Sequence, residues 1–207
     1  MVRIYLITDR HVIRDLPGAV AAALSVLPIG TAAVQLREKD LPREELVRLA
    51  RVLHPLCHSA KAPLLINTHV EVVKEVRADG VHLPAGGMSI ADARRALGPG
   101  ALIGQSCHTR KEVACAGEEG ADFVVFGPVW DTEGKKGQGM TALHLAAKTS
   151  PLPVFAVGGV TPARARRAIN AGAHGVACIR SVLGAADPAS AALEMWEAVS
   201  SKPQPTT

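Results

Sequence analysis

The stretch PVFAVGGVTP, residues 153–162, joins an apolar run to two glycines and a Thr-Pro pair. The run predicts a buried strand, because strands covered on both faces are almost continuously hydrophobic. Thr161 and Pro162 predict the N-cap and first turn of a helix. Gly158 and Gly159 let backbone N–H groups at that helix start approach an anion. The stretch therefore predicts a strand–helix unit with an anion-binding turn, although a tight turn without a ligand fits the same residues.

The same kind of unit recurs along the whole chain. The predicted strands span residues 3–8, 32–37, 63–67, 80–83, 101–106, 123–127, 153–158 and 175–179. Helical patterns follow them, as at 42–56, 89–97 and 109–120, the last two opening on the N-cap residues Ser89 and Thr109. The apolar stripe of the first of these helices comprises Leu46, Leu49, Val52 and Leu53.

Eight units in 207 residues, about 26 residues each, predict an α/β fold of one domain over residues 1–200, a (β/α)₈ TIM barrel. A doubly wound open sheet is the alternative. It is disfavoured because no GxGxxG turn follows the first strand. The polar, proline-containing end at 201–207 predicts a disordered tail.

Composition limits the class of protein. No apolar run approaches the length of a membrane span, and the opening MVRIYLITDR meets charged residues too early for a signal peptide, so we expect a cytoplasmic protein. The net charge of +4 suits a small anionic ligand and does not require nucleic acid. The four cysteines form no CxxC pair, which favours buried free thiols over disulfides or metal ligands.

In a TIM barrel the loops that follow the strands build the working face. Arg37 and Lys39 lie two residues apart after the second strand, so both point to one side, toward an anionic substrate in the barrel mouth. A solvated charge cluster is the alternative. The polar residues that follow the other strands, and that we take as substrate-binding candidates, include Asn67, Ser106, Gly158, Gly159, Arg180 and Ser181.

His108 follows the fifth strand and is the candidate acid/base, because an imidazole can take up and return a proton near neutral pH. A metal site formed by His69, His82 and His108 is disfavoured because no nearby acid or cysteine completes a ligand set. The long glycine-rich segment 126–141 predicts a loop that closes over the substrate, with Thr132 and Lys135 as binding residues. A surface loop without function is the alternative.

Together these motifs resemble the thiamin phosphate synthase/TenI family of (β/α)₈ barrels, over almost the whole chain. The resemblance is carried by YLITDR, VQLREK, LIN, ADGVHLP, IGQSCHT, ADFVVFGPVWDTEGKKG, PVFAVGGVTP and GAHGVACIR. The family holds two enzymes of thiamin biosynthesis. The synthase joins a pyrimidine pyrophosphate to a thiazole phosphate with magnesium, and the TenI-type thiazole tautomerase aromatises a carboxythiazole phosphate.

Departures from the synthase pattern favour the TenI-type branch. Thr68 stands where the synthase has a magnesium-binding aspartate after Asn67, and Gly87 stands where it has a second acid. Magnesium prefers carboxylate oxygens, so the resemblance implies an isomerase without metal or cofactor. Magnesium-dependent synthesis is the alternative, with Asp9, Glu38 or Asp131 supplying oxygens.

The resemblance also implies roles for the site residues and partners. His108 corresponds to the catalytic histidine of the tautomerase, and Arg37 and Lys39 hold the substrate carboxylate. The glycine pair and the amides after the eighth strand hold the phosphate. The expected partners are a small phosphorylated thiazole and a second copy of the chain in a homodimer. A regulator that senses a thiazole phosphate and binds DNA through Arg164, Arg166 and Arg167 is a weaker alternative.

Overall fold

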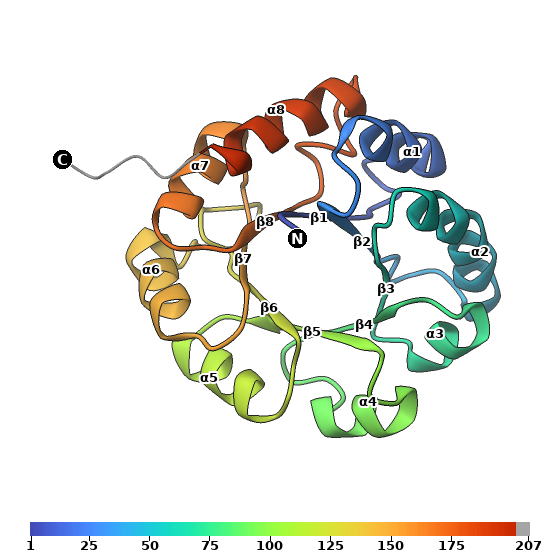
Figure 1. Ribbon diagram of the computed structural model, residues 1–207, viewed down its shortest axis with the longest axis horizontal. Coiled ribbons are helices and arrows are strands. Elements are labelled where there is room, and N and C mark those ends of the chain that lie inside the picture. Colours follow the sequence, from blue (N-terminus) through green and yellow to red (C-terminus); the bar gives the residue numbers. More distant parts are fainter. Residues whose placement is uncertain (202–207) are drawn as a thin grey trace.

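The computed structural model describes residues 1–201 and confirms the TIM barrel. Eight parallel strands close into a ring in chain order, and the eight helices surround it (Figure 1). The strands are β1 Ile4–Ile7, β2 Ala32–Leu36, β3 Leu64–Asn67, β4 Gly80–Leu83, β5 Leu102–Cys107, β6 Phe123–Phe126, β7 Val154–Val157 and β8 Gly175–Cys178. The helices are α1 Leu16–Val26, α2 Arg43–Ser59, α3 Val70–Val76, α4 Ile90–Leu97, α5 Arg110–Glu118, α6 Gly139–Thr149, α7 Pro162–Asn170 and α8 Pro188–Ser200. The closed ring excludes the doubly wound sheet.

Alternation along the strands divides the apolar side chains between two cores. One set faces the helices and forms the larger core between ring and helices. The other set fills the barrel and consists of Tyr5, Ile7, Ala33, Leu65, Phe123, Val125, Phe155 and Ala177. Because side chains of a strand alternate between its faces, the inward set fixes which residues beyond each strand end point into the mouth.

The helix starts agree with the predicted caps at three places. Ser89, Thr109 and Thr161 each accept a hydrogen bond from a backbone N–H in the first turn of the following helix. Pro162 occupies the first turn of α7, as predicted. The cysteines are free, and three of the four are buried, Cys57, Cys107 and Cys178.

Helix α2 differs from the prediction. It runs to Ser59 rather than to residue 56, and its start at Pro42 has no side-chain cap. Its buried face contains Leu46, Val47, Ala50, Leu53 and Cys57, whereas Val52 is 49% exposed and lies outside the predicted stripe. Leu46 and Leu53 of the predicted stripe are buried and Leu49 packs, partly buried, against the core, so the prediction is wrong at Val52 alone.

Gly104 is a packing requirement inside the barrel. A Cβ on this residue would lie 2.7 Å from Nδ1 of His82 and would also clash with the ring of Phe123. We therefore expect Gly104→Ala to lower the free energy of unfolding by roughly 1–3 kcal/mol, the usual effect of overpacking a core. Urea unfolding measures this. The control is Gly100→Ala, where a Cβ meets no atom within 4 Å, and an equal loss in both variants would contradict the explanation.

Within residues 1–201, no helix is long and apolar enough to span a bilayer. The predicted tail at 201–207 lies outside the described residues except for Ser201, whose hydroxyl donates to the carbonyl of Glu197 at the end of α8.

Candidate active site

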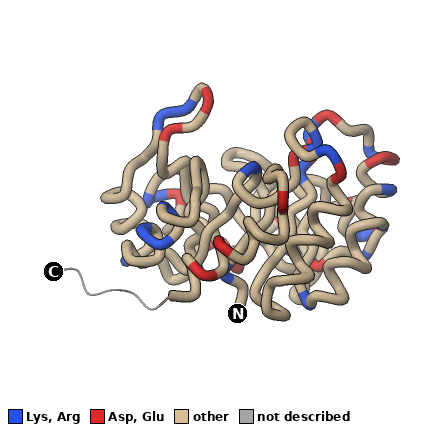
Figure 2. Tube along the Cα trace, turned by 90° about the horizontal axis from the view of Figure 1, so that it is seen from above, with Lys and Arg blue, Asp and Glu red and all other residues tan. Residues whose placement is uncertain are grey.

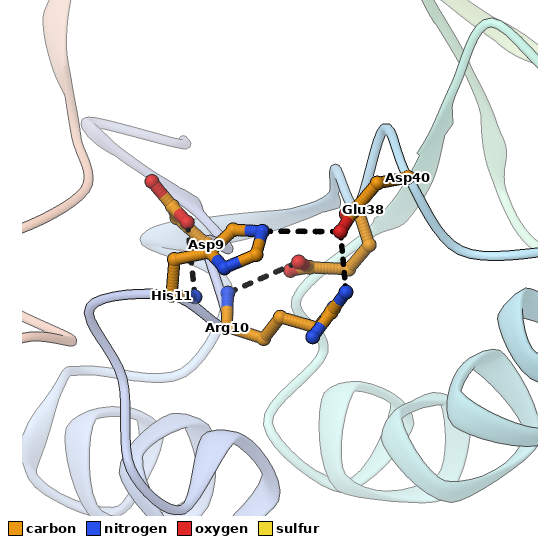
Figure 3. A network of polar contacts seen from close by, with 5 residues as sticks. All are labelled: Asp9, Arg10, His11, Glu38 and Asp40. Atoms are coloured by element: carbon orange, nitrogen blue, oxygen red, sulfur yellow. Dashed lines mark hydrogen bonds and ion pairs between the residues drawn. The ribbon is translucent and has the colours of Figure 1, made fainter.

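The carboxyl ends of the strands form one rim, opposite the chain's N-terminus in side view (Figure 2). There the loops after β1 and β2 are tied together by Glu38, which is 3% exposed (Figure 3). One carboxylate oxygen of Glu38 accepts from Oγ1 of Thr8 at 2.6 Å and the other accepts from the N–H of Arg10 at 3.0 Å. Oγ1 of Thr8 in turn accepts from the N–H of Arg37 at 2.9 Å. The backbone that carries Arg37 is thus fixed by a buried carboxylate.

Asp40 is part of the same network. Its carboxylate pairs with the guanidinium of Arg10 and lies 3.2 Å from Nε2 of His11 (Figure 3). Because both carboxylates meet partners from the loop after β1, this side of the rim is a rigid support for the cations beside it.

Arg37, Lys39 and Lys135 form a cationic cluster at the mouth. Arg37 follows the inward-facing Gln35 by two residues, and Lys39 follows it by four. The positive charge of Arg37 lowers the pKa of Lys39, with smaller contributions from burial and from Lys135. In the described part of the chain, none of the three cations forms an ion pair with a carboxylate. Uncompensated cations that repel one another favour an anionic ligand.

His108 lies on the same rim, directly after β5. Its Nδ1 is 2.6 Å from the carbonyl oxygen of Gly127, and its backbone N–H donates to Glu112 at 2.5 Å. A carbonyl only accepts, so Nδ1 carries the proton and donates it, which leaves Nε2 of a neutral ring as a base. The side chain is exposed and can meet a ligand.

Gly158 and Gly159 have φ values of +95° and +62°, in the region that favours glycine. They also lie against the loop after β6. A Cβ on Gly158 would be 2.5 Å from Cβ of Pro128, and one on Gly159 would be 3.3 Å from the carbonyl oxygen of Asp131. Close packing therefore accounts for both glycines without a ligand, while the helix start at Thr161 still directs free N–H groups to the rim.

The loop between β6 and α6 is more structured than predicted. The N–H of Val129 donates to the carbonyl of Val157 at 2.7 Å, which fixes the start of the loop to β7. Thr132 and Lys135 exchange two backbone hydrogen bonds of 3.0 Å at its tip, and a side-chain oxygen of Asp131 accepts from the N–H of Gly137 at 2.7 Å. Residues 127–138 contain no helix or strand, as predicted, but these hydrogen bonds order the loop more than its glycine-rich composition indicates.

Arg164 supports this loop rather than forming a solvated basic face. Its guanidinium donates to the carbonyl of Gly159 at 2.7 Å and lies 5.5 Å from the ring centroid of Trp130. The first of the three arginines proposed for DNA contact thus packs between α7 and the loop.

Arg180 and Ser181 follow β8 on the rim, but their side chains have other partners. The guanidinium of Arg180 lies 3.5 Å from the carboxylate of Glu133, and both side chains are largely exposed. Burial raises the pKa of the Cys178 thiol to about 12, with an opposing contribution from the nearby Ser181. In the turn after β8, the backbone amides are therefore better candidates for holding a phosphate than the side chains of Arg180 and Ser181.

Glu133 places a negative charge beside the proposed phosphate position. We expect Glu133→Gln to tighten the binding of inorganic phosphate two- to fivefold, because an exposed pair contributes up to about 1 kcal/mol and its loss frees Arg180. Titration calorimetry at low salt measures this. Glu45→Gln, which breaks the exposed pair with Arg48 on α2, is the control, and unchanged affinity in Glu133→Gln would contradict the expectation.

Asn67 and Ser106 complete the set of predicted residues. The side-chain amide of Asn67 donates to the hydroxyl of Thr68 at 2.9 Å, and the hydroxyl of Ser106 lies 2.9 Å from Nε2 of His82. The structure thus brings every predicted site residue to the carboxyl rim. Asn67, Arg180 and Ser106 each have a protein partner there.

The residues present do not fit a magnesium site. Thr68 has no carboxylate and adopts φ +68°, a strained conformation for a β-branched residue, and Gly87 has no side chain. Of the alternative ligands, both oxygens of Glu38 accept hydrogen bonds, one oxygen of Asp131 accepts from Gly137, and one oxygen of Asp9 accepts from the N–H of His11. Within residues 1–201, no three His, Cys, Asp or Glu side chains are grouped as a metal ligand set.

Sequence reasoning missed several residues that build the site. Tyr5 and Gln35 lie inside the barrel, 1% exposed, and are linked by a hydrogen bond of 3.1 Å. A signal existed, because both are polar residues at inward positions of otherwise apolar strands. Glu38 was named only as a possible metal ligand, since its buried contacts with Thr8 and Arg10 depend on the loop after β1.

One hollow of the surface lies away from this rim. It has a volume of about 530 Å³ and is lined by residues that precede strands, including Arg3, Pro153 and His174, at the amino end of the barrel. A second hollow of about 340 Å³ lies on the carboxyl rim, lined by Gly87, Ser106 and Glu112 among others. We place the candidate site at the carboxyl rim because the proton-transfer and anion-binding groups are there.

A closed (β/α)₈ barrel with cations, an imidazole and a glycine turn on its carboxyl rim is an arrangement found in barrel enzymes that bind small phosphorylated molecules. The chain matches the thiamine monophosphate synthase family over residues 4–182, and it belongs to that family. It is 46% identical over 191 residues to a putative thiamine-phosphate synthase of Geobacter sulfurreducens, covering 89% of this chain and 88% of the relative.

Other relatives agree with this assignment. The thiamine-phosphate synthase of Salinibacter ruber is 36% identical, with 95% of this chain and 88% of the relative covered. The solved structure of a thiamine phosphate pyrophosphorylase from Pyrococcus furiosus superposes with a TM-score of 0.88 at 31% identity, covering 96% of this chain and 95% of the other. These relatives carry the name of the synthase, the alternative function, and not the name of a tautomerase.

Proposed function

We propose that this chain is a thiazole tautomerase that aromatises a carboxythiazole phosphate in thiamin biosynthesis. One set of contacts carries the proposal. Nδ1 of His108 bonds the carbonyl of Gly127, and the next residue, Pro128, packs against Gly158. These contacts link the His108 ring through Gly127 and Pro128 to the glycine turn, and a proton transfer on a phosphate-anchored substrate requires such proximity.

The proposed reaction moves one proton. Nε2 of His108 takes it from the ring carbon beside the carboxylate, and the imidazolium returns a proton to the exocyclic side-chain carbon. One C–H bond breaks and one forms, so the step needs no oxidant, reductant or metal. Arg37 and Lys39 hold the carboxylate and stabilise the charge that develops when the proton leaves. The amides around Gly158 and Gly159 and after β8 hold the phosphate.

Thiamin phosphate synthesis is the second candidate, and the relatives' names support it better than they support the tautomerase. Both reactions need a site for a thiazole phosphate, so the cationic mouth and glycine turn serve either. The donor set favours the tautomerase, because Thr68 and Gly87 supply no carboxylate for the magnesium that the synthase uses. The homodimer stays a prediction in both cases.

Paired assays with the purified chain test the proposal. One assay follows the ultraviolet absorbance of aromatic product from the carboxythiazole phosphate with EDTA present. The other supplies pyrimidine pyrophosphate and thiazole phosphate with magnesium and measures pyrophosphate release. We expect turnover in the first assay alone. Turnover in the second assay alone would replace the tautomerase with the synthase.

A further inference from the structure

Four polar side chains, each from a different strand, form a continuous series of hydrogen bonds in the barrel interior, which we call the polar chain. Nε2 of Gln35 on β2 donates to the hydroxyl of Tyr5 on β1 at 3.1 Å. That hydroxyl lies 3.4 Å from Nδ1 of His82 on β4, and Nε2 of His82 lies 2.9 Å from the hydroxyl of Ser106 on β5. The first three residues are 1–3% exposed, and Ser106 is half-buried, so the chain runs from the closed interior to the mouth.

Chemistry fixes the direction of these hydrogen bonds. The amide nitrogen of Gln35 only donates, so the oxygen of Tyr5 accepts from it. If Nδ1 of His82 also donated to that oxygen, the buried proton of Tyr5 would have no acceptor among the described residues, so Tyr5 donates to Nδ1. A neutral imidazole that accepts at Nδ1 carries its proton on Nε2 and donates it to Ser106. Burial, with a smaller contribution from Arg37, lowers the pKa of His82 to about 3, which keeps the ring neutral. The proton of the Ser106 hydroxyl then has no partner among residues 1–201.

The surroundings hold this arrangement in place. The ring of Tyr5 lies 5.7 Å from that of His82, and the ring of Phe123 lies 6.0 Å from it, measured between centroids. The missing side chain of Gly104 leaves the space that Nδ1 of His82 occupies. Among the described residues no buried side-chain nitrogen or oxygen is without a partner.

We infer that Tyr5, Gln35 and His82 are positioning residues that make the Ser106 hydroxyl a hydrogen-bond donor to an anionic substrate at the mouth. A carboxylate or an ionised phosphate only accepts hydrogen bonds. If the Ser106 hydroxyl donated to His82, it would present only lone pairs to such an anion. Burying four polar side chains costs desolvation free energy that apolar side chains would not cost. A hydrogen-bond donor held in a fixed orientation is the feature that the polar chain provides in return. The inference rests on the proposed function only for the identity of the anion.

The protonation of His82 tests the inference without any substrate. In the ¹⁵N-labelled protein near neutral pH, we expect the His82 ring to be neutral, with the proton on Nε2 and none on Nδ1. Tyr5→Phe removes the donor to Nδ1 and should shift the proton toward Nδ1. Phe155→Leu is the control, since it removes a ring 6.2 Å from that of Tyr5 without touching the hydrogen bonds, and it should leave the tautomer unchanged. A proton on Nδ1 in the unaltered protein overturns the inference.

Binding of the aromatic carboxythiazole phosphate provides the second test. We expect Ser106→Ala to weaken its affinity about 10-fold or more, as for a hydrogen bond to a charged group. Tyr5→Phe should weaken it in the same direction, and the double variant should bind no more weakly than Ser106→Ala. His82→Gln, which keeps a donor toward Ser106, should bind more tightly than His82→Leu. Losses that multiply in the double variant, or full affinity in Tyr5→Phe, overturn the inference.

The two proposals fail separately. If the unaltered protein does not bind the carboxythiazole phosphate, the proposed function is wrong, and the same variants are then titrated with inorganic phosphate. The tautomer of His82 still decides the inference in that case.

Discussion

Replacing His108 with alanine should lower the rate of aromatisation by about 10²- to 10⁴-fold, the usual contribution of a positioned acid/base. The affinity for the carboxythiazole phosphate should change little, because the imidazole does not hold the phosphate or the carboxylate. The residue lies at the exposed end of β5, so the fold is expected to tolerate the change. Single-turnover absorbance measurements and calorimetry separate the two quantities.

His144→Ala is the matched control for this variant. His144 is also exposed and also places Nδ1 near a backbone carbonyl, that of Ala171 at 3.0 Å, but it lies on α6, away from the mouth. It should retain the full rate. An unaltered rate in His108→Ala would remove the imidazole from the mechanism, and an equal loss of rate and affinity would assign it to binding.

Replacing Arg37 with alanine should weaken binding of the carboxythiazole phosphate about 10- to 100-fold. A hydrogen bond to a charged group contributes about 1.5–3 kcal/mol, and each 1.4 kcal/mol is a factor of ten in affinity. The hydrogen bond from the backbone N–H of Arg37 to Thr8 does not involve the side chain, so the loop after β2 should keep its position. Arg48→Ala, an exposed arginine on α2, is the control and should leave affinity unchanged.

The Arg37→Ala variant should also change the pKa of Lys39. The charge of Arg37 is the largest cause of the lowered pKa of Lys39, so Arg37→Ala should raise that pKa toward its ordinary value. A protonated lysine binds an anion better, so affinity falls as pH rises through this pKa, and in Arg37→Ala the fall should begin at higher pH. NMR titration of the Lys39 side chain measures the shift. A pKa that stays unchanged would show that the two side chains are not neighbours.

The barrel was predictable because its signals are local and repeated. The apolar strands and the capping residues Ser89, Thr109 and Thr161 each predict the structure of the residues next to them. The closed topology follows from repeating one strand–helix unit eight times. The positions of Arg37 and Lys39 were predictable for the same reason, because strand alternation continues past the end of β2.

Features that depend on contacts between distant loops were not predictable. Nothing near Glu38 in the sequence shows that Thr8 and Arg10 will satisfy its carboxylate, and nothing near Arg164 shows that Trp130 will lie beneath it. The pairing of Arg180 with Glu133 likewise joins residues 47 positions apart. Such contacts form only when the ring closes and brings the loops after different strands together.

The central claim is that the imidazole and the anion-binding groups serve one ligand on one rim. A crystal structure with the carboxythiazole phosphate bound tests it most directly. We predict the phosphate at the amides around Gly158 and Gly159, the carboxylate beside Arg37, and Nε2 of His108 about 3 Å from the carbon that loses its proton. A ligand bound at the amino end of the barrel, or on the rim with His108 out of reach, would contradict the account.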